Sequence, residues 1–463
     1  MEQRVAVAAE RMTAAESRAA FSLAGIFSLR MLGLFMIYPV FSVYAERLRD
    51  ATPTTIGLAL GVYGLTQAIF QIPFGMLSDR LGRKPVIATG LLIFAIGSVV
   101  AALAHSIQGV ILGRILQGAG AVGSTILALA ADLTREEHRT KAMAVIGMTI
   151  GFSFALAVVL GPILGTWVGV SGIFWLTAVL ALGGIAVLMF TVPRPAHSRL
   201  HRDTEPVPAL FKRVLTDGQL LRLDFGILTL HLILTASFVA LPLALRNGAG
   251  LDVHHQWYLY LPVLLVSVVA MVPFIILAEK RHHMKGVFLG AVAALGVAEL
   301  LLMEWHASLV IVAAALIVFF TAFTLMEATL PSLISKVAPP DSKGTAMGVY
   351  SSSQFLGIFI GGTAGGWFYG HGGLAEVFGF TAAAALVWLL VVATMQQPRY
   401  LNSYLLNVGE IDETQADRLA QQLGAVRGVA QAVVAASEGV AYLKVDSETL
   451  DEAALREFSA RQA

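Results

Sequence analysis

Ionisable side chains interrupt several long apolar stretches of this 463-residue chain, and they are the first candidates for chemistry. They are Arg30, Arg114, His231 and Glu327. A charge inside a lipid bilayer is costly, so residues of this kind generally carry protons or bind ions and substrates. A carboxyl group and an imidazole can both titrate near neutral pH when their surroundings change. Glu327 and His231 are therefore candidates for proton coupling.

Each of these residues also has a simpler structural interpretation. Glu327 and Arg30 could form a permanent ion pair that fastens the two halves of the chain together. Arg114 could serve helix packing rather than proton transfer. Gln67 and Gln71 could line the path of the proton or substrate, or they could be buried polar groups of a helix interface. The residues alone leave these alternatives open.

A second charged cluster lies in the segment GMLSDRLGRKP at residues 75–85. Arg83 follows Asp79 by four residues, and Asp132 ends another apolar stretch at the same expected membrane face. An arginine that reaches two carboxylates at the edge of the low-dielectric region would fix two spans to the loop. The simpler interpretation is a surface salt bridge that contributes little. The candidate residues of this site are Gly75, Asp79, Arg80, Gly82, Arg83, Lys84 and Asp132.

The composition of the chain is that of a membrane protein. Hydrophobic residues make up 57% of it and charged residues only 13%, whereas an average soluble protein has about 25% charged residues. Apolar runs of about 20 residues can cross a bilayer, and they predict twelve spans. We place the spans at residues 21–45, 56–78, 86–104, 107–131, 142–168, 172–192, 222–246, 256–278, 285–303, 307–331, 344–370 and 374–395. Glu299 and Glu304 fall towards the end of the ninth span, and we interpret them as interfacial.

Loop charges predict the orientation of these spans. Lysine and arginine are concentrated after even-numbered spans, whereas the loops after odd-numbered spans hold only Arg47, Arg49 and Arg246. The positive-inside bias therefore predicts that both termini and the central connector are cytoplasmic. The absence of cysteine excludes disulfides and thiolate metal sites, and the net charge of +1, with its basic residues dispersed over loops, predicts no nucleic-acid partner.

The two halves of the chain repeat each other at an offset of 204 residues. Gly161 aligns with Gly365, and TKAMAV at 140–145 aligns with GTAMGV at 344–349. A duplicated six-helix unit explains this shared register, and such repeats are typical of transporter folds. We predict a cytoplasmic tail, an N-terminal six-helix bundle, a cytoplasmic connector and a C-terminal six-helix bundle at residues 1–20, 21–192, 193–221 and 222–395.

Residues 401–463 are soluble in character and predict a small cytoplasmic α+β domain. Strand-like segments and helical segments follow one another in the order βαββα, which is that of a ferredoxin-like domain. We expect strands at 404–408, 429–434 and 440–445 and helices at 413–423 and 448–458. The domain lacks the paired cysteines of a metal carrier. A regulatory or partner-binding role and a purely stabilising role both stay open.

Four motifs in the first half resemble those of the major facilitator superfamily. DRLGRK at 79–84 resembles the signature loop between spans two and three, and RILQG at 114–118 resembles the span-four motif. Leu32-Gly33 and Pro39-Val40 resemble the span-one pattern of 12-span drug/proton antiporters, with Ser42 where proline is common. The segment with Gly161, Pro162 and Gly165 resembles the span-five motif of antiporters, with Thr166 in place of the usual second glycine.

This resemblance implies a fold and a site. The fold is an all-α membrane protein of twelve transmembrane helices in two six-helix pseudo-repeats, here with a ferredoxin-like C-terminal domain. Spans one, four, seven and ten would line a central cavity, which gives one ionisable residue to each. At 1.5 Å per residue, Arg30, His231 and Glu327 would all lie about 14 Å from the cytoplasmic end. These three residues could then form one coupled cluster.

The resemblance also implies a conformational lock formed by Asp79, Arg83 and Asp132, which holds the outward-facing state. The second-half copy of this loop, AEKRHH at residues 278–283, is degenerate. We therefore expect an asymmetric lock that is carried mainly by the first half.

The function most consistent with the sequence is that of a transporter in the inner cell membrane, driven by the proton gradient without a cofactor. Export of a small amphipathic molecule by proton antiport is the first hypothesis. Proton-coupled uptake of a small solute is the second, and a membrane sensor that signals through its C-terminal domain is the third. We expect a monomer, with a substrate, protons and the lipid bilayer as its partners. The chain has no phosphate-binding loop or nucleophile triad, so an enzyme is not expected.

Overall fold

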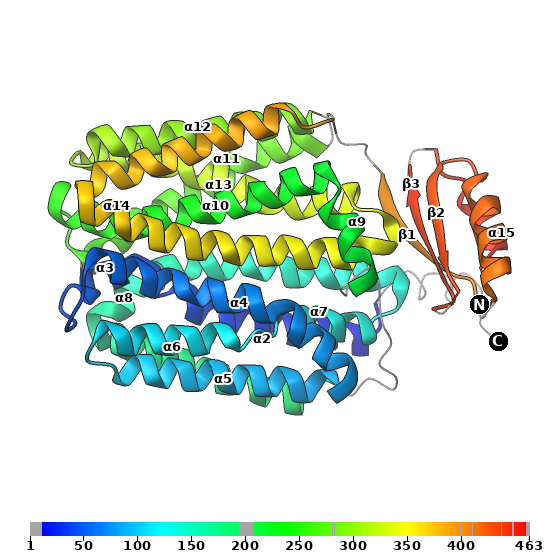
Figure 1. Ribbon diagram of the computed structural model, residues 1–463, viewed down its shortest axis with the longest axis horizontal. Coiled ribbons are helices and arrows are strands. Elements are labelled where there is room, and N and C mark those ends of the chain that lie inside the picture. The colour runs from blue at the N-terminus through cyan, green and yellow to red at the C-terminus, as the bar shows by residue number, and fades with distance from the viewer. Residues whose placement is uncertain are drawn as a thin grey trace.

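Two helical bundles and a small sheet domain make up the protein (Figure 1). The computed structural model describes residues 12–193, 207–279, 281, 283–397, 401–409, 411–436, 438–446 and 449–459. The helices of the first bundle are α2 (Ala14–Phe35), α3 (Tyr38–Ala45), α4 (Pro53–Leu81), α5 (Arg83–Leu103), α6 (Ile107–Ala119), α7 (Gly123–Asp132) and α8 (Glu136–Phe190). Those of the second bundle are α10 (Gly218–Leu243), α11 (Trp257–Glu279), α12 (Met284–Trp305), α13 (Leu309–Val337) and α14 (Lys343–Ala393). Short helical segments lie between them: η1 (Pro208–Leu210), α9 (Phe211–Leu215), η2 (Ala244–Gly248), η3 (Val253–His255) and η4 (Pro340–Ser342).

Ten continuous or nearly continuous helical stretches in the described residues are long and apolar enough to cross a membrane. Two of them, Lys141–Phe190 and Lys343–Ala393, have 50 and 51 residues, which is about twice what a bilayer core of about 30 Å requires. Each is broken by a glycine with positive φ, Gly169 at 66° and Gly373 at 79°. A residue with a Cβ atom rarely adopts that conformation. The glycines make hairpin turns between two spans, so the twelve predicted crossings are confirmed.

The internal repeat is also visible in the positions of the helices. The first helix of each bundle begins at Ala14 and at Gly218, and the second at Pro53 and at Trp257. Both pairs are 204 residues apart, as are the turn glycines of α8 and α14. The first helix begins seven residues before the expected first span, because Thr13 and Glu16 form a capping box.

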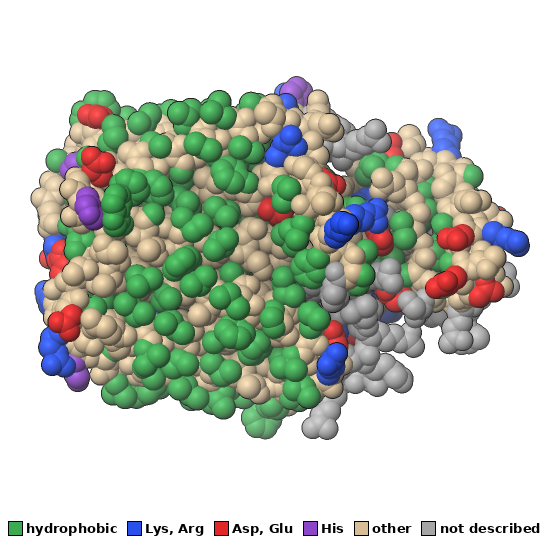
Figure 2. Space-filling model, in the orientation of Figure 1, with side chains coloured by type: hydrophobic (Ala, Val, Ile, Leu, Met, Phe, Trp, Pro, Cys, Tyr) green, Lys and Arg blue, Asp and Glu red, His purple; other side chains and the backbone are tan. Residues whose placement is uncertain are grey.

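Apolar side chains cover the lateral surface of the two bundles, and charged side chains are concentrated at the ends (Figure 2). We call the end that holds Gly82 and Asp132 the loop end, and the end that holds Asp50 and Gly169 the far end. Phe152, Trp167, Val269 and Phe190 are among the large hydrophobic residues that are more than two-thirds exposed. Such a belt is unfavourable in water and suits lipid.

A seam of glycines joins the two bundles along α4 and α14. A Cβ atom on Gly57 would lie 2.2 Å from the carbonyl oxygen of Gly362 and 2.7 Å from Cα of Gly366. Nearer the middle, a Cβ on Gly64 would lie 2.3 Å from the Phe355 carbonyl oxygen. Backbones that touch in this way gain packing energy in lipid, where there is no hydrophobic drive between helices. At the far end, Arg246 and Glu46 add an ion pair of 2.8 Å across the same interface.

The C-terminal residues form the expected α+β domain. Its elements are β1 (Asn402–Asn407), α15 (Glu413–Gly424), β2 (Val429–Ala435), β3 (Val440–Val445) and α16 (Glu452–Glu457). The sheet order is β1-β3-β2, and β3 is antiparallel to both neighbours. A split β-α-β unit with a strand inserted between its two strands gives this order. The predicted element order and the small α+β architecture are confirmed.

Lys444 of β3 connects this domain to the second bundle. Its ammonium group donates to the Ser335 carbonyl oxygen of α13 and lies 3.3 Å from Ser403 Oγ of β1. The residue is only 1% exposed. Burial, together with the nearby charge of Lys343, lowers the pKa of Lys444 to about 7.

We expect the Gly57→Ala variant to open the far end of the seam. The added methyl group meets the backbone of α14 at both Gly362 and Gly366, which cannot move aside within the helix, so α4 and α14 must separate. The chain has no cysteine, so a Val239→Cys reporter at the far-end interface can be labelled selectively with a maleimide. Labelling should become several-fold faster in Gly57→Ala. The control is Gly147→Ala, because a Cβ atom there meets nothing within 4 Å; equal labelling rates in the two variants would show that the seam does not close the far end.

We expect attachment of the C-terminal domain to strengthen as pH rises from about 7 towards 10. Below pH 7, Lys444 is charged whether the domain is attached or detached, and attachment carries the full cost of burying that charge. Above its lowered pKa the buried amine is neutral, while the detached amine stays charged up to about pH 10.4. The rate of proteolytic release of the domain should therefore fall with pH. In Lys444→Met, compared at each pH with the exposed Lys212→Met, this pH dependence should disappear; its persistence would assign the effect to another group.

Candidate functional site

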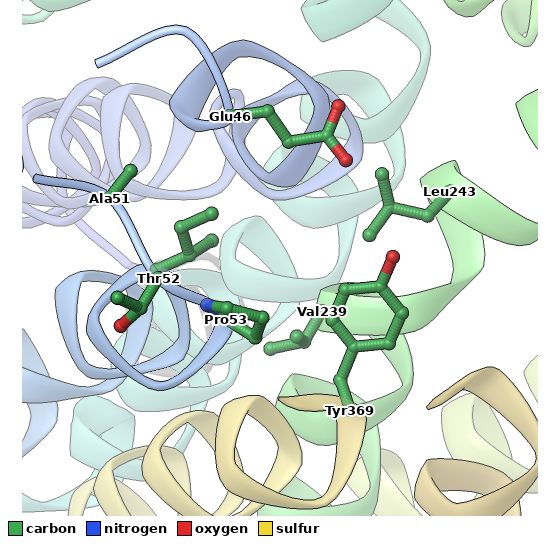
Figure 3. A pocket seen from close by; sticks show the side chains of 8 residues that line it. Glu46, Ala51, Thr52, Pro53, Val239, Leu243 and Tyr369 are labelled. Atoms are coloured by element: carbon green, nitrogen blue, oxygen red, sulfur yellow. The ribbon is translucent and has the colours of Figure 1, made fainter. Parts of the chain in front are cut away.

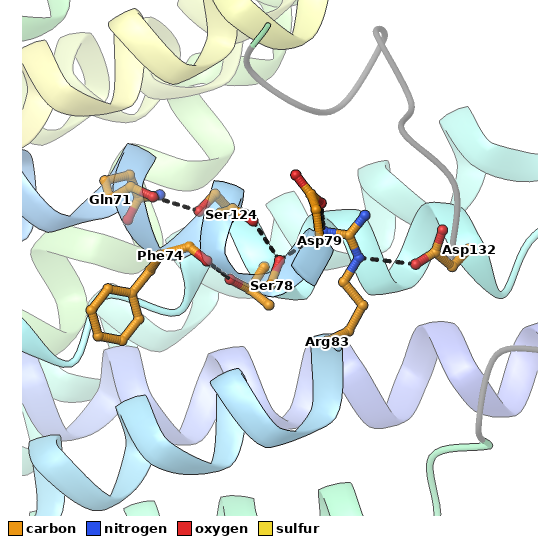
Figure 4. A network of polar contacts seen from close by, with 9 residues as sticks. Gln71, Phe74, Ser78, Asp79, Arg83, Ser124 and Asp132 are labelled. Atoms are coloured by element: carbon orange, nitrogen blue, oxygen red, sulfur yellow. Dashed lines mark hydrogen bonds and ion pairs between the residues drawn. The ribbon is translucent and has the colours of Figure 1, made fainter. Parts of the chain in front are cut away.

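The charged loop between α4 and α5 brings three ionisable residues together (Figure 4). Asp79 lies in the last turn of α4, Arg83 opens α5, and Asp132 ends α7. The Arg83 guanidinium donates to Asp79 through Nη1 and to the Asp132 carboxylate through Nε, at 3.0 Å. Nη1 also donates to Ser78 Oγ at 2.7 Å. One arginine therefore joins the ends of three helices of the first bundle.

The two carboxylates of this triad differ in burial. The side chains of Arg83 and Asp132 are each 1% exposed, whereas that of Asp79 is 33% exposed. A buried ion pair that loses one partner costs about 3–5 kcal/mol, because the other charge stays buried without compensation. An exposed pair contributes less than about 1 kcal/mol. The interpretation as a weak surface salt bridge fits Asp79 but not Asp132.

The remaining candidate residues of the loop have distinct positions. Gly82 connects the two helices with φ of +89°, which only glycine adopts readily. A Cβ on Gly75 would come within 3.0 Å of Ser124 Oγ. Lys84 donates to the Val192 carbonyl oxygen beyond α8, and Arg80 is exposed. In the second-half copy at 278–283, several positions lie outside the described residues.

A polar network in the first bundle surrounds Arg30. Nη2 of this guanidinium donates to the Tyr63 hydroxyl at 2.8 Å and to Gln67 Oε1 at 2.6 Å. Gln67 Nε2 in turn donates to Gln71 Oε1 at 2.6 Å. The rings of Tyr63 and Phe94 lie 6.0 and 5.4 Å from the Arg30 guanidinium carbon, in the range of cation–π contacts. The two glutamines thus extend a hydrogen-bonded chain along α4.

Arg114 lies near this network but is held differently. Nε and Nη2 donate to the carbonyl oxygens of Ala59 and Leu60 at 3.2 Å each, and Nη1 donates to Gln117 Oε1 at 2.8 Å. The guanidinium also stacks near the Tyr63 ring, at 4.9 Å. Every nitrogen of Arg114 has an acceptor within the first bundle. This geometry favours the structural interpretation of the residue.

His231 and Glu327 meet in the second bundle. The His231 Nε2 atom lies 3.7 Å from Glu327 Oε2 and 2.8 Å from Gln354 Nε2. Gln354 Nε2 also donates to Glu327 Oε1 at 3.4 Å. The His231 side chain is 3% exposed and that of Glu327 is 21% exposed. Three helices, α10, α13 and α14, thus contribute an imidazole, a carboxyl group and an amide to one cluster.

The expected cluster of Arg30, His231 and Glu327 is divided in the structure. His231 and Glu327 lie together, but neither makes an ion pair with Arg30 in the described residues. The Arg30–Glu327 ion pair considered from the sequence is therefore not formed in this conformation. The sequence predicts that Arg30, His231 and Glu327 lie at equal depth along their helices. Depth does not determine the rotation of each helix about its axis, and that rotation decides which side chains meet.

Two buried carboxyl groups lie where sequence reasoning did not place them. Glu299 is fully buried, and Ser237 Oγ and Thr381 Oγ1 donate to its two oxygens at 2.8 and 2.7 Å. The interfacial interpretation of Glu299 was therefore wrong, because α12 turns this residue towards α10 and α14 rather than towards the membrane surface. Asp224 is 5% exposed and was missed. Its spacing of seven residues from His231, two helical turns on the same face of α10, was the available signal.

The span-five motif is a packing site between α8 and the first span. A Cβ on Gly161 would lie 2.3 Å from the Met36 carbonyl oxygen and 2.8 Å from Pro39 Cγ. At Gly165 a Cβ would lie 3.4 Å from Val40 Cγ1. Pro162 lies inside the continuous helix. Close helix approach is what these small residues achieve in this structure.

A small pocket of about 200 Å³ lies at the far end of the seam (Figure 3). It is lined by residues of both bundles, among them Glu46, Pro53, Val239 and Tyr369. Pockets for drug-sized ligands generally measure at least about 300 Å³. The pocket is remote from both Arg30 and Glu327, which do not line it, so we regard it as a gap left by closure of the far end.

We expect the triad residues to rank in stability in the order of their burial. Arg83→Ala removes the guanidinium that pairs with the buried Asp132 carboxylate and should cost about 3–5 kcal/mol. Asp132→Asn should cost less, and Asp79→Asn least, because Asp79 is partly solvated. Thermal unfolding in detergent measures this, with Arg80→Ala as the matched control in the same loop. If Arg83→Ala and Arg80→Ala lost equal amounts of stability, the triad would contribute no more than a surface salt bridge.

Comparisons with known proteins agree with this architecture. A family model described as Major Facilitator Superfamily matches residues 23–362 and 264–404. The chain is 47% identical over 439 residues to the inner membrane transport protein YajR of Escherichia coli strain K12. The alignment covers 95% of this chain and 96% of that protein. The chain is 26% identical to the multidrug resistance protein MdtH of Proteus mirabilis, over 75% of this chain and 86% of that protein. The crystal structure of a D-xylose-proton symporter superposes with a TM-score of 0.65 at 15% identity, covering 82% of this chain and 98% of that chain. The chain therefore belongs to the Major Facilitator Superfamily and is a membrane transporter, not an enzyme.

Proposed function

We propose that the chain is a proton-coupled secondary transporter in which Glu327 and His231 carry the coupling proton. The observation that supports this most strongly is the 3.7 Å approach of His231 Nε2 to the Glu327 carboxylate, with Gln354 bonded to both. The cluster lies beside the contact between the bundles, because Phe355, the residue after Gln354, packs against Tyr63 of the first bundle at 6.1 Å. A charge change at this point can bias the way the two bundles meet.

The hydrogen bonds of His231 are consistent with a neutral imidazole that is ready to accept a proton. Nδ1 lies 3.3 Å from the Ile227 carbonyl oxygen, which can only accept, so the ring proton belongs on Nδ1. Nε2 is then free to accept from the Gln354 amide. If His231 were protonated at Nε2, its N–H would face the N–H of the Gln354 amide, and both groups are donors. Rotation of the Gln354 amide by 180° would place its oxygen, an acceptor, opposite His231 Nε2 instead. In this proposal Gln354 changes its hydrogen bonds in step with the protonation of His231.

The rest of the proposal concerns the conformational cycle. The Arg83 triad holds α4, α5 and α7 together and acts as the lock at the loop end, while the glycine seam closes the far end; both are formed in this conformation. The concentration of basic loop residues supports a cytoplasmic placement of the loop end, both termini and the C-terminal domain, in the inner membrane. We keep the ferredoxin-like domain as a regulatory or stabilising element that contacts α13 and η4.

The direction of transport is proposed as export of a small amphipathic molecule by proton antiport. The span-five motif of the sequence and the relation to MdtH, a named multidrug resistance protein, support this direction. Inside-out membrane vesicles test it. Antiport predicts that adding an exported compound from a panel of amphipathic molecules releases protons from vesicles with an acidic interior, whereas symport predicts no release. A sensor would move no compound at all.

We expect Glu327→Gln to abolish the pH dependence of the conformational equilibrium. The amide keeps the size and the hydrogen bonds of the carboxyl group but cannot be charged. The rate of maleimide labelling of Val239→Cys is divided at each pH by the rate for the same cysteine in the unfolded protein, which corrects for ionisation of the thiol. This ratio should vary with pH in the parent and become flat in Glu327→Gln. Glu304→Gln is the matched control, because Glu304 is an exposed glutamate on α12. If Glu327→Gln kept the pH profile of the parent, Glu327 would not be the coupling residue.

A further inference from the structure

Arg30 has unused hydrogen-bonding capacity in a buried position. A guanidinium has five N–H donors, and the two on Nη2 point to the oxygens of Tyr63 and Gln67. Nε and Nη1, which carry the other three, have no acceptor in the part of the chain that the structure describes. The residue as a whole is 1% exposed. Three donors of a positive charge are thus removed from water without a partner.

Two other buried arginines of the first bundle, Arg83 and Arg114, show how such a charge can be accommodated. Arg83 binds two carboxylates, and Arg114 donates through all three nitrogens to two carbonyl oxygens and Gln117. Arg30 has neither arrangement. Its acceptors, Tyr63 and Gln67, are neutral, and its nearest aromatic face is that of Phe94. Unsatisfied buried donors cost about 1–3 kcal/mol each and more on charged groups, so the surroundings that the protein gives Arg30 are energetically unfavourable.

The position of Arg30 links this deficit to transport. Tyr63, its hydrogen-bond partner, packs on Phe355 of the second bundle, so Arg30 lies one side chain away from the interface between the bundles. Glu327, on the other side of that interface, has His231 and Gln354 as partners and does not neutralise Arg30. An anion that arrives at this interface from outside the protein would supply both the missing charge and the missing acceptors.

We propose that Arg30 binds the acidic group of an amphipathic organic acid, and that the transported substrate belongs to this chemical class. The inference rests on the proposed function, since it assumes that the interface between the bundles holds a substrate. The guanidinium takes the oxyanion of the substrate, and Tyr63, Phe94 and Phe355 provide an apolar and aromatic surface beside it. Uncharged and cationic amphipathic molecules lack the group that the site requires.

Thermal unfolding of the purified full chain in detergent tests the proposal with matched pairs of compounds. The acids are 1-naphthoate, 4-phenylbutyrate and indole-3-acetate, and each is compared with its uncharged amide. At least one acid should raise the unfolding temperature in a concentration-dependent way, while its amide should not. Arg30→Gln should weaken this binding at least 10-fold, and Arg222→Gln, at the loop end of α10, should leave it unchanged. Equal binding of an acid and its amide, no binding of any acid, or full binding in Arg30→Gln would each overturn the proposal.

Two further measurements separate this proposal from simpler explanations. Without any compound, Arg30→Met should be at least as stable as the parent, because it removes an uncompensated charge; a marked loss of stability would assign Arg30 a structural role. Sulfate should give less Arg30-dependent protection than the organic acids, and equal protection would mean that the site takes an inorganic anion. The pH-dependent labelling that Glu327 controls is measured without substrate. A failure of proton coupling can therefore be distinguished from a failure of anion binding.

Discussion

A charge buried among these helices has no water around it, and this constraint explains where most polar side chains lie. Arg83 is neutralised by two carboxylates at the loop end. Arg114 is surrounded by backbone oxygens of α4, and Glu299 takes one hydroxyl on each oxygen. The positions of Ser78, Gln117, Ser237 and Thr381 follow from these needs. Arg30 and the Glu327 cluster are less completely satisfied, and this difference supports the proposals that they bind a ligand and a proton.

The two halves share one scaffold but differ in the charge that they bury. In the membrane-spanning middle of the described residues, the first bundle contributes the guanidinium groups of Arg30 and Arg114, and the second contributes the acids Glu299 and Glu327. A duplicated unit has thus diverged in chemistry while its helix positions stayed 204 residues apart. The guanidinium of Arg114 is bonded within the first bundle and the carboxyl group of Glu299 within the second.

The sequence predicted the twelve crossings, the repeat and the α+β domain because these depend on hydrophobic length and local turn chemistry. It also predicted the triad, since Arg83 follows Asp79 by four residues across the turn at Gly82 and Asp132 ends a span at the same face. It failed where rotation about a helix axis decides the outcome. Glu299 has a depth that suits an interfacial residue, but packing turns it inwards. Arg30 and Glu327 have matching depths and face different partners. Only contacts between helices determine such rotations, and those contacts are not local in the sequence.

The glycine seam shows how such contacts fix rotation. A Cβ atom on Gly357 or Gly361 would meet the backbone of α10, while one on Gly362 or Gly366 would meet the backbone of α4. α14 therefore touches a helix of its own bundle on one face and a helix of the other bundle on the adjacent face. With both faces fixed at backbone distance, α14 has little freedom to rotate. Gln354 and Tyr350 precede these glycines on the same helix, so their directions are set by the seam. In the proposed transport cycle, movement between the bundles would carry Gln354 and its partners His231 and Glu327 as one unit relative to Arg30.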